Sequence, residues 1–399
     1  MSDNSSQNKL NLKFDNTEIA FKSKSNAGLK KAYLLFKVMG SASLVKIGNS
    51  LTKIALGIHF PVGWAAKPTL YSHFVGGETI TKCKTNVEKL GKHNVKAILD
   101  YSVEGKDDDK DIEKALDETI RSIKNAGQTP NIPFAVFKPT AFGKSIVLEK
   151  ASEGIELNEI EKSEVQKFKD RINTLCKTAF EADIPILVDA EDTWFQNIFD
   201  VVVTEMMEKY NKEKAIVFNT YQMYRWDRLD ILKQAHKAAT EGSYFLGAKF
   251  VRGAYMEKER ARAAEKGYKD PIQPDKESTD RDYNLALKFC VENIDNITIF
   301  NGTHNEYSSV YMAELMEEKG IAKNDVRFWF SQLYGMSDNI SFNLAEAGYN
   351  VAKYVPYGPV NYVLPYLLRR AEENTSVKGQ SSRELQLIET ELNRRKNSK

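Results

Sequence analysis

The sequence predicts an α/β fold, a (βα)8 TIM-like barrel preceded by an N-terminal helical segment. Eight short apolar runs occur between residues 94 and 358, helical stretches separate them, and polar side chains follow nearly every run. Eight strands that are each followed by a helix are the count of a (βα)8 barrel. A doubly wound sheet is the alternative, but the phosphate-cradling GxGxxG after its first strand is absent.

Length and composition are those of a globular protein. The 399 residues suffice for one large barrel or two ordinary domains, and 42% of them are hydrophobic and 28% charged. The 57 basic and 55 acidic residues leave a net charge of +2, which gives no whole-chain argument for nucleic acid as a partner. Cys83, Cys176 and Cys290 have neither CxxC nor metal-site spacing, so we interpret them as reduced thiols of a cytoplasmic protein.

The first 92 residues divide into a polar arm and a helical segment. Residues 1–27 lack the apolar core of a signal peptide and carry acidic residues that argue against a transit peptide. Residues 28–92 form the predicted helical segment, with lysine-bearing amphipathic stretches over 28–60 and a further helix at about 77–92. The stretch 28–60 fits a membrane-surface patch or, as we prefer, helices packed on their neighbour. No run approaches the length of a membrane span.

Residues 93–399 form the predicted barrel, in which strands and helices alternate. The expected strands are 94–101, 132–139, 184–191, 214–222, 245–255, 297–304, 326–335 and 349–358, and helical stretches between them include 111–125, 159–182, 226–241, 281–293 and 306–319. The acidic run at 106–111 is interpreted as a solvated loop.

The chemistry of a barrel collects at the carboxyl ends of its strands. Taken singly, Lys138 could snorkel to a rim, His304 could be a satisfied histidine, and Asp189 and Glu191 could cap the following helix. Taken together, we interpret the polar strand ends as one site over the barrel mouth. They are Asp100, Glu104, Lys138, Asp189, Glu191, Asn219, Lys249 to Tyr255, Thr303 to Asn305, Gln332 to Tyr334, and Tyr354.

The last strand turns at Pro356 and Gly358 into a helix with an unusual face. Pro359 suits a first helical position, and Tyr366, Arg369, Arg370 and Glu373 follow at i, i+3, i+4 and i+7. Each guanidinium can hold a carboxylate or phosphate through two hydrogen bonds. The alternative is a basic helix edge paired with its own glutamates.

Several other kinds of site are excluded by their missing residues. The GKS at 143–145 lacks the glycine that a phosphate loop needs five residues earlier, where Lys138 stands. The sequence contains no HExxH or His/Cys cluster for a metal and no GxSxG nucleophile elbow. Aromatic, basic and amide groups around an anion clamp suit an enzyme whose cofactor performs the difficult step.

These residues resemble the proline dehydrogenase family. The matching segments are VDAE at 188–191, KFVRGAY at 249–255, THN at 303–305, KYVPYG at 353–358 and YLLRRAEEN at 366–374. ERARAAEKGYKDPI at 259–272 and QLYGM at 332–336 are similar to its eukaryotic-type branch. The resemblance covers roughly residues 28–395 and implies a distorted (βα)8 barrel that holds FAD non-covalently. The family oxidises L-proline to Δ1-pyrroline-5-carboxylate and passes the electrons to a membrane quinone.

The resemblance also implies substrate roles for matching positions. Arg369 and Arg370 would hold the proline carboxylate, Lys138 would be a third cation with Asp100 beside it, and Glu104 could pair with Arg369 to close the site. The ring would be walled by Tyr255, Leu333, Tyr354 and Tyr366. A clamped carboxylate aims Cδ at flavin N5, and no side chain is assigned as the base. The catalytic set is Lys138, Lys249, Tyr255, Tyr354, Arg369 and Arg370.

Cofactor roles follow in the same way. Lys249 would approach flavin N5, where the bacterial bifunctional enzymes carry arginine, and Asn219 stands where they carry glutamine. The implied FAD contacts are Asp189, Glu191, Asn219, Lys249, Val251, Gly253, Ala254, Thr303, His304, Asn305, Gln332, Arg370 and Glu373.

Two alternative functions stay open. A hydroxyproline dehydrogenase would look similar but carries serine where this chain has Tyr354, so this tyrosine favours proline. A flavin-free barrel that binds a small anion is the alternative from a different class. Quinone as acceptor would require peripheral contact with a membrane, for which residues 28–60 are the candidate.

Overall fold

The computed structural model describes residues 12–41, 43, 67–102, 107–376 and 380–398. All eight predicted strands are present, and every strand pairing is parallel. Strands that alternate with helices along the chain make the predicted (βα)8 barrel fold. The chain divides into a central unit, residues 105–331, and a terminal unit, residues 1–104 and 332–399. The boundaries predicted at residues 27 and 92 stay a prediction.

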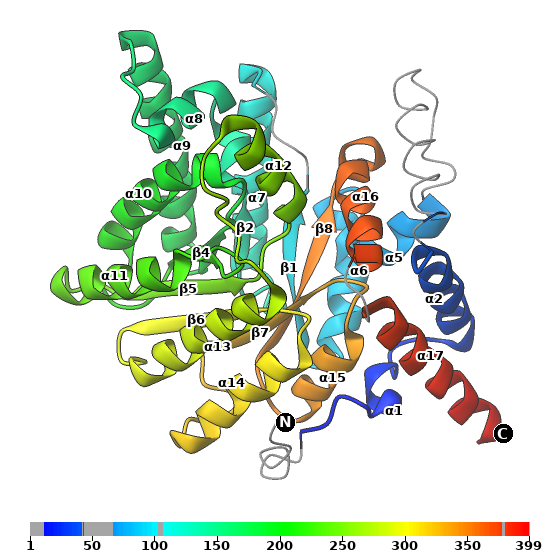
Figure 1. Ribbon diagram of the computed structural model, residues 1–399. Coiled ribbons are helices and arrows are strands. Elements are labelled where there is room, and N and C mark those ends of the chain that lie inside the picture. The colour runs from blue at the N-terminus through cyan, green and yellow to red at the C-terminus, as the bar shows by residue number, and fades with distance from the viewer. Residues whose placement is uncertain (1–11, 42, 44–66, 103–106, 377–379, 399) are drawn as a thin grey trace. The chain divides into compact units, whose positions relative to one another are not determined.

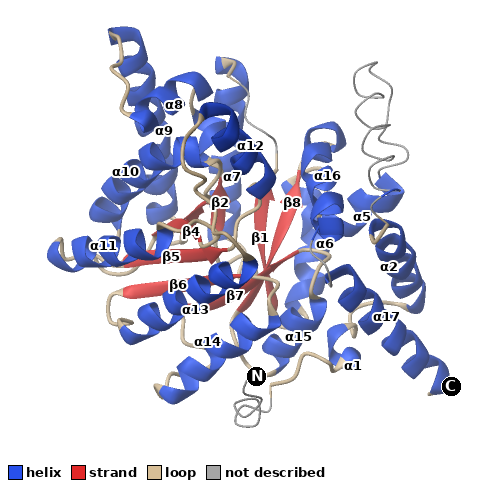
Figure 2. Ribbon diagram, viewed as in Figure 1, coloured by secondary structure: helices blue, strands red, loops and turns tan. Residues whose placement is uncertain are grey.

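The central unit contains consecutive parallel strands with helices against them. Each strand from β2 to β6 pairs with the next, and α10 packs on β4 and α13 on β6 (Figures 1 and 2). The strands are β2 (Ala135–Phe137), β3 (Ile186–Val188), β4 (Val217–Gln222), β5 (Leu246–Val251), β6 (Ile297–Gly302) and β7 (Phe328–Leu333), whose last two residues belong to the terminal unit. The helices are α7 (Asp109–Gly127), η2 (Pro139–Phe142), α8 (Ser145–Glu153), α9 (Glu159–Glu181), α10 (Thr193–Tyr210), α11 (Arg228–Glu241), α12 (Met256–Lys266), α13 (Lys276–Glu292) and α14 (Glu306–Glu318).

Helix boundaries follow local capping. Asn158 and Glu161 form a reciprocal capping box that begins α9 where predicted. Asp108 caps α7, so the predicted solvated loop at 106–111 instead supplies the cap and first turn of a helix. Asp275 accepts the Ser278 N–H and begins α13 five residues before the predicted start at 281. Apolar periodicity alone did not indicate this polar first turn.

Aromatic rings pack against one another in the interior of the central unit. The Phe134 ring lies 5.7 Å from that of Phe218 and 5.1 Å from those of Phe300 and Trp329. These rings identify the inward face of β4 and β6. Because strand side chains alternate, Thr220 and Gln222 share the inward face of β4 with Phe218.

The terminal unit joins the two ends of the chain. β1 (Val95–Tyr101) pairs with β8 (Val351–Tyr357) along its whole length. In Figure 1, α17, in red, lies beside α2, in blue, although they come from opposite ends of the sequence. The remaining bounds are α1 (Thr17–Ala20), α2 (Asn26–Met39), η1 (Lys67–Tyr71), α5 (Ser72–Phe74), α6 (Ile80–Gly91), α15 (Asp338–Glu346), α16 (Val360–Ser376) and α17 (Gln380–Asn397).

An apolar core built by distant segments holds the terminal unit together. Phe36 of α2, Phe74 of α5, Leu367 of α16 and Ile388 of α17 are all buried in one cluster. The helical prediction for 28–60 is confirmed over α2, and residues 44–60 lie outside the described part of the chain. Within the described ranges, no helix is both long enough and apolar enough to cross a membrane.

Candidate active site

Three predicted charged residues meet at the carboxyl ends of β2, β3 and β5. Lys249 Nζ lies 2.5 Å from Asp189 Oδ1, and Lys138 Nζ lies 3.6 Å from Asp189 Oδ2. Lys249 is 4% exposed, so its ammonium depends on this carboxylate in place of water. The Asp189 N–H donates to the Phe137 carbonyl and extends the pairing of β2 with β3 to the site. The prediction that these strand ends carry one polar cluster is confirmed for these three residues.

The segment after β5 runs as bare backbone against an aromatic ring. Gly253 has φ of +127°, and a Cβ at this position would lie 2.4 Å from the Tyr224 ring. Only glycine satisfies both conditions. The Tyr224 N–H donates to the Arg252 carbonyl, which fixes the segment against β4, and the adjoining Ala254 is exposed. Backbone groups of this segment are therefore accessible to a ligand.

Arg252 connects the ends of β5 and β6. Its guanidinium donates to Thr303 Oγ1 at 2.6 Å and to Ser308 Oγ at 3.0 Å, pairs with Asp280, and lies 4.3 Å from the centre of the Tyr283 ring. The same Thr303 hydroxyl accepts the Asn305 N–H, and Asn305 caps α14. His304, between them, is half-buried. The prediction included Arg252 in the polar strand end from Lys249 to Tyr255 but gave it no individual role.

On β4, Asn219 was predicted for the site, but Gln222 is the amide that faces inward. Asn219 donates to Asp200 Oδ1 at 2.9 Å and accepts the Thr220 N–H. Gln222 pairs in register with Val251, as Thr220 does with Lys249, so it lies on the Lys249 face. Gln222 is 2% exposed, and its Oε1 has no hydrogen-bond partner in the described part of the chain. Side chains alternate along a strand, so the alternation along β4, combined with the predicted place of Lys249 on β5, could have indicated Gln222 from the sequence.

Glu191 is bound to the turn that follows Lys138. Its carboxylate accepts the Thr140 N–H at 2.9 Å and the Thr140 hydroxyl at 2.7 Å. Burial raises its pKa to about 7. Glu191 thereby fixes η2, the short helix directly after Lys138.

Three of the four predicted ring-wall residues belong to the terminal unit, on β8, β7 and α16, and the fourth, Tyr255, directly precedes α12 in the central unit. Tyr354 and Tyr366 are each 7% exposed. Leu333 packs against the apolar cluster that contains Tyr366. Gln332, also predicted, accepts the Ser341 hydroxyl at 2.6 Å and points toward α15. Two of the four predicted wall residues, Leu333 and Tyr366, thus share one apolar cluster.

The predicted anion clamp lies on α16. Arg370 is 8% exposed, its guanidinium lies 5.0 Å from the centre of the Tyr366 ring, and Arg369 is half-buried. This i, i+4 contact confirms that Tyr366 and Arg370 share a face. The Pro359 carbonyl accepts the Tyr362 and Val363 N–H groups, so the helix begins one residue after the proline. The side chain of Glu373 lies outside the described residues.

Asp100 ends β1 in the same unit. It is 4% exposed and accepts the Ser102 hydroxyl at 2.8 Å. Its register partner is Pro356, two residues beyond Tyr354, so Asp100 and Tyr354 lie on one face of the β1–β8 pair. Glu104, predicted to close the site, lies outside the described residues.

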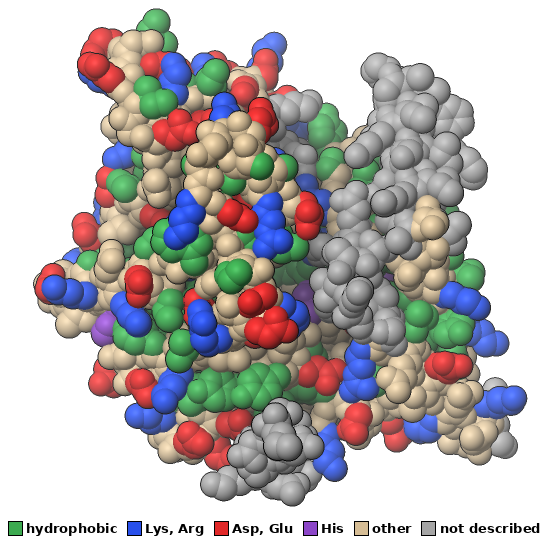
Figure 3. All heavy atoms as spheres, viewed as in Figure 1, with side chains coloured by type: hydrophobic (Ala, Val, Ile, Leu, Met, Phe, Trp, Pro, Cys, Tyr) green, Lys and Arg blue, Asp and Glu red, His purple; other side chains and the backbone are tan. Residues whose placement is uncertain are grey.

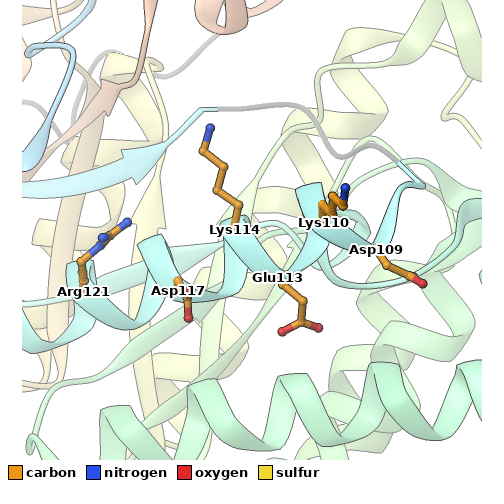
Figure 4. Close-up of a pocket in the computed structure, with 6 residues that line it drawn as sticks. All are labelled: Asp109, Lys110, Glu113, Lys114, Asp117 and Arg121. Atoms are coloured by element: carbon orange, nitrogen blue, oxygen red, sulfur yellow. The ribbon is translucent and has the colours of Figure 1, made fainter.

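A shallow pocket along α7 does not coincide with these residues (Figure 4). Lys110 and Lys114 project to one side of the helix and Glu113 to the other. Three acidic and three basic side chains of one helix line it: Asp109, Lys110, Glu113, Lys114, Asp117 and Arg121. Mixed charges on one exposed helix are typical of a solvated surface.

Comparison with known proteins decides the family. The proline dehydrogenase family model matches residues 83–383. The chain belongs to the proline dehydrogenase family. Proline dehydrogenase is an oxidoreductase, and the eukaryotic mitochondrial members among the relatives agree with the predicted branch. Proline dehydrogenase 1, mitochondrial, of Caenorhabditis elegans is 29% identical, over 97% of this chain and 89% of the relative.

Two further proteins are similar to this proline dehydrogenase family member. The carbapenem antibiotics biosynthesis protein CarD of Pectobacterium carotovorum subsp. carotovorum is 35% identical, over 81% of this chain and 84% of the relative. Proline utilization A of Bdellovibrio bacteriovorus, whose crystal structure shows it inactivated by N-propargylglycine, matches with a TM-score of 0.70 and 19% identity. The match covers 90% of this chain but only 38% of that one, and it supports the fold alone.

Proposed function

We propose that this chain binds FAD, oxidises L-proline to Δ1-pyrroline-5-carboxylate, and delivers the electrons to a membrane quinone. The observation that carries the proposal is the buried Lys249–Asp189 pair at the strand ends, at 2.5 Å. A buried ammonium fixed by a carboxylate is a preorganised charge, which stabilises negative charge that develops on a bound partner. Membership of the proline dehydrogenase family supports a flavin as this bound partner.

The residues of the central unit fit a flavin. The buried amide of Gln222, whose Oε1 has no partner in the described part of the chain, matches the donors and acceptors along the edge of such a ring. The bare backbone at Gly253 permits close approach of a phosphate or ribityl group. We propose that Lys249, Asp189, Val251, Ala254, Thr303 and His304 contribute the remaining contacts, with Asn219, Glu191, Asn305, Gln332, Arg370 and Glu373 as further candidates. When bound, FAD supplies the hydride acceptor.

The predicted substrate residues would hold and orient proline. Arg369 and Arg370 can each bind a carboxylate through two charge-assisted hydrogen bonds, and Lys138 would add a third positive charge. The Tyr354 and Tyr366 rings would exclude water from the pyrrolidine ring, which strengthens these contacts. We propose Asp100, Glu104, Tyr255 and Leu333 as the other substrate contacts. The amine must lose its proton before Cδ can release a hydride, and water can accept that proton.

An anaerobic titration tests the central proposal. The purified protein should show flavin absorbance, and this absorbance should bleach on addition of L-proline. Reduction of a short-chain ubiquinone on re-addition tests the electron acceptor. A protein that carries no flavin even after incubation with FAD would overturn the proposal in favour of a small-anion-binding barrel.

Helix α2 supports the proposed contact with a membrane. Leu34 is 63% and Val38 45% exposed, one helical turn apart, beside the exposed Lys30, Lys31 and Lys37. This is the pattern of a peripheral amphipathic helix. On the face shown in Figure 3, basic and acidic side chains are interspersed.

Flotation with anionic liposomes tests this surface. The double variant Leu34→Ser/Val38→Ser should bind less than the native protein, whereas Val326→Ser, at a position that is 77% exposed in the central unit, should not differ. Equal flotation of all three proteins would exclude α2 as the membrane contact.

A further inference from the structure

Four charged residues of the terminal unit meet in a buried cluster, which we call the Asp338 cluster. Asp338 begins α15, and its two oxygens lie 2.9 Å from Lys353 Nζ and 3.0 Å from Lys24 Nζ. Lys353, on β8, is fully buried, and Glu384, on α17, is 5% exposed. Burial works against ionisation of Asp338, but the two lysines outweigh it and hold its pKa below the usual range. Asp338 is thus an anion between two cations.

The Asp338 cluster holds one turn of backbone, residues 333–337, which we call the β7 turn. Lys353 donates to the carbonyls of Leu333 and Met336, and Glu384 accepts the Ser337 N–H. His73 Nε2 lies 2.8 Å from the Gly335 carbonyl. The polar backbone of the turn is therefore bound by side chains from β8, α17 and α5.

The β7 turn adopts a conformation that depends on these contacts. Gly335 has φ of +82°, and a Cβ there would lie 2.5 Å from the His73 carbonyl oxygen. Ser337 has φ of +48°, which is uncommon outside glycine. Such strain persists only where the surroundings fix it, and it concentrates at functional sites. An apolar set of similar volume often stabilises a protein as well as buried charges do, so stability alone does not account for the Asp338 cluster.

The turn carries residues of the proposed substrate site. It starts at Leu333, and the Tyr334 N–H donates to the carbonyl of Tyr354 at 2.8 Å. Tyr354 directly follows Lys353 on β8. Lys353 is therefore connected to the backbone of two proposed wall residues. It directly precedes Tyr354 on β8, and its ammonium binds the carbonyl of Leu333.

We propose that Asp338 and Lys353 are positioning residues that set substrate-ring specificity, by fixing Leu333 and Tyr354 relative to each other. The proposal rests on the function proposed above. Loss of the Asp338 charge frees Lys353 to leave the Leu333 and Met336 carbonyls, and the wall widens. Binding of the ring and discrimination against ring substituents then decline together, while the flavin contacts in the central unit are unaffected.

The experiment compares Asp338→Asn with Glu391→Gln. Glu391 is a fully buried carboxylate of the same unit that pairs with Arg394 and Arg395 and accepts the Thr17 hydroxyl, and none of these three partners lies in the β7 turn. Both variants weaken the attachment between the chain ends. Only Asp338→Asn should alter the wall.

Two measurements separate positioning from general loosening. The first is the dissociation constant of a proline analogue with ring oxygen in place of the amine, from the change in flavin absorbance without turnover. The second is the ratio of kcat/KM for L-proline to that for trans-4-hydroxy-L-proline. For Asp338→Asn we expect affinity for the analogue to fall at least tenfold and the ratio at least threefold, with native flavin content. Glu391→Gln should stay within twofold of the native protein in both.

Each other outcome overturns the inference. It fails if Asp338→Asn stays within twofold of the native protein, or if Glu391→Gln shows the same losses. Where Asp338→Asn cannot be purified, Lys24→Met decides, because it removes one of the two cations that hold Asp338; we expect at least a threefold loss of affinity for the analogue, and native affinity would refute the proposal. A native protein that does not bleach with proline refutes the proposed function instead.

Discussion

In the central unit, the charged side chains at the strand ends pair with one another, whereas in the terminal unit the charges around the β7 turn come from both ends of the chain. Lys138 and Asp189 directly follow β2 and β3, and Lys249 lies on β5, within a run of parallel strands. Lys24 and Glu384 reach Asp338 and the β7 turn from segments more than 300 residues apart. The charged residues of the central unit are thus supported by their own sheet, and those of the terminal unit by segments from both ends of the chain.

This difference predicts how far from each set of charged residues a substitution can act. Neighbouring parallel strands fix the first set through register, so a single substitution there should act locally. The second set depends on long-range packing of α2, α16 and α17, so changes far from the substrate residues should reach it. The predictions below test this contrast, from the largest expected effect to the smallest.

The largest effect should come from Asp189→Asn in the central unit. The variant leaves the buried Lys249 ammonium without its anionic partner, and removal of one partner of a buried pair costs about 3–5 kcal/mol. Urea unfolding should show this loss, and flavin content should fall. Asp325→Asn is the control, because its partner Arg327 is 38% exposed, and it should cost less than about 1 kcal/mol. Equal losses would contradict a special role for Asp189.

Replacement of Arg369 or Arg370 with methionine should abolish tight binding of proline. Each variant removes a charge-assisted pair from a partly dry site, a loss of about 2–5 kcal/mol. KM for proline should rise steeply while the protein stays folded and keeps flavin, somewhat loosened for Arg370→Met. Arg121→Met, on the exposed face of α7, serves as the control. Near-native KM in both clamp variants would remove these arginines from the site.

Tyr354→Ser should change which substrate is preferred. An aromatic wall fits the apolar ring of proline, whereas a 4-hydroxyl buried against it without good partners loses about 1–3 kcal/mol. The native enzyme should therefore prefer L-proline over trans-4-hydroxy-L-proline by roughly tenfold in kcat/KM. The variant should turn over proline more slowly and narrow this gap. A native preference for hydroxyproline, or an unchanged ratio, would show that Tyr354 is not the selector.

The same contrast explains what the sequence could predict. Alternating apolar runs and helical stretches determine the (βα)8 fold, and polar residues after those runs located Lys138, Asp189 and Lys249, because strand ends are defined by local pattern. Gln222 was missed because the NTYQ stretch offers two amide side chains, Asn219 and Gln222, and only the face of β4 distinguishes them. The Asp338 cluster has no local signature, since Lys24, Lys353 and Glu384 meet only through tertiary packing.

Buried carboxyls in both units provide the smallest expected effect, a dependence of stability on pH. Burial raises the pKa of Glu191 and of Glu384 to about 7 from 4.5. A carboxyl whose pKa is higher in the folded state binds its proton more tightly there than in the unfolded chain. Its contribution to stability is therefore complete below pH 4.5 and is lost as the pH rises through 7.

Glu391 should act in the opposite direction within the same terminal unit. Burial raises its pKa, but hydrogen bonds from Arg394, Arg395 and Thr17 outweigh this and lower it below 4.5. Its contribution is present above the unfolded pKa and is lost only as the pH falls through the folded value. Glu384→Gln and Glu391→Gln should therefore change opposite ends of one stability curve.

The measurement is the free energy of unfolding from pH 3.5 to 8 for the native protein and three glutamine variants. Glu191→Gln and Glu384→Gln should each flatten the decline between pH 5 and 8 by on the order of 1 kcal/mol. Glu391→Gln should leave that range unchanged and flatten the acid limb. Two results would show that burial at these carboxyls does not govern the pH response. One is a flatter neutral range in Glu391→Gln, and the other is an unchanged decline between pH 5 and 8 in both other variants. Glu384 also accepts the Ser337 N–H. If Glu384→Gln flattens the stability curve but leaves the ratio of kcat/KM for the two substrates unchanged, Glu384 contributes to the pH response without positioning the β7 turn.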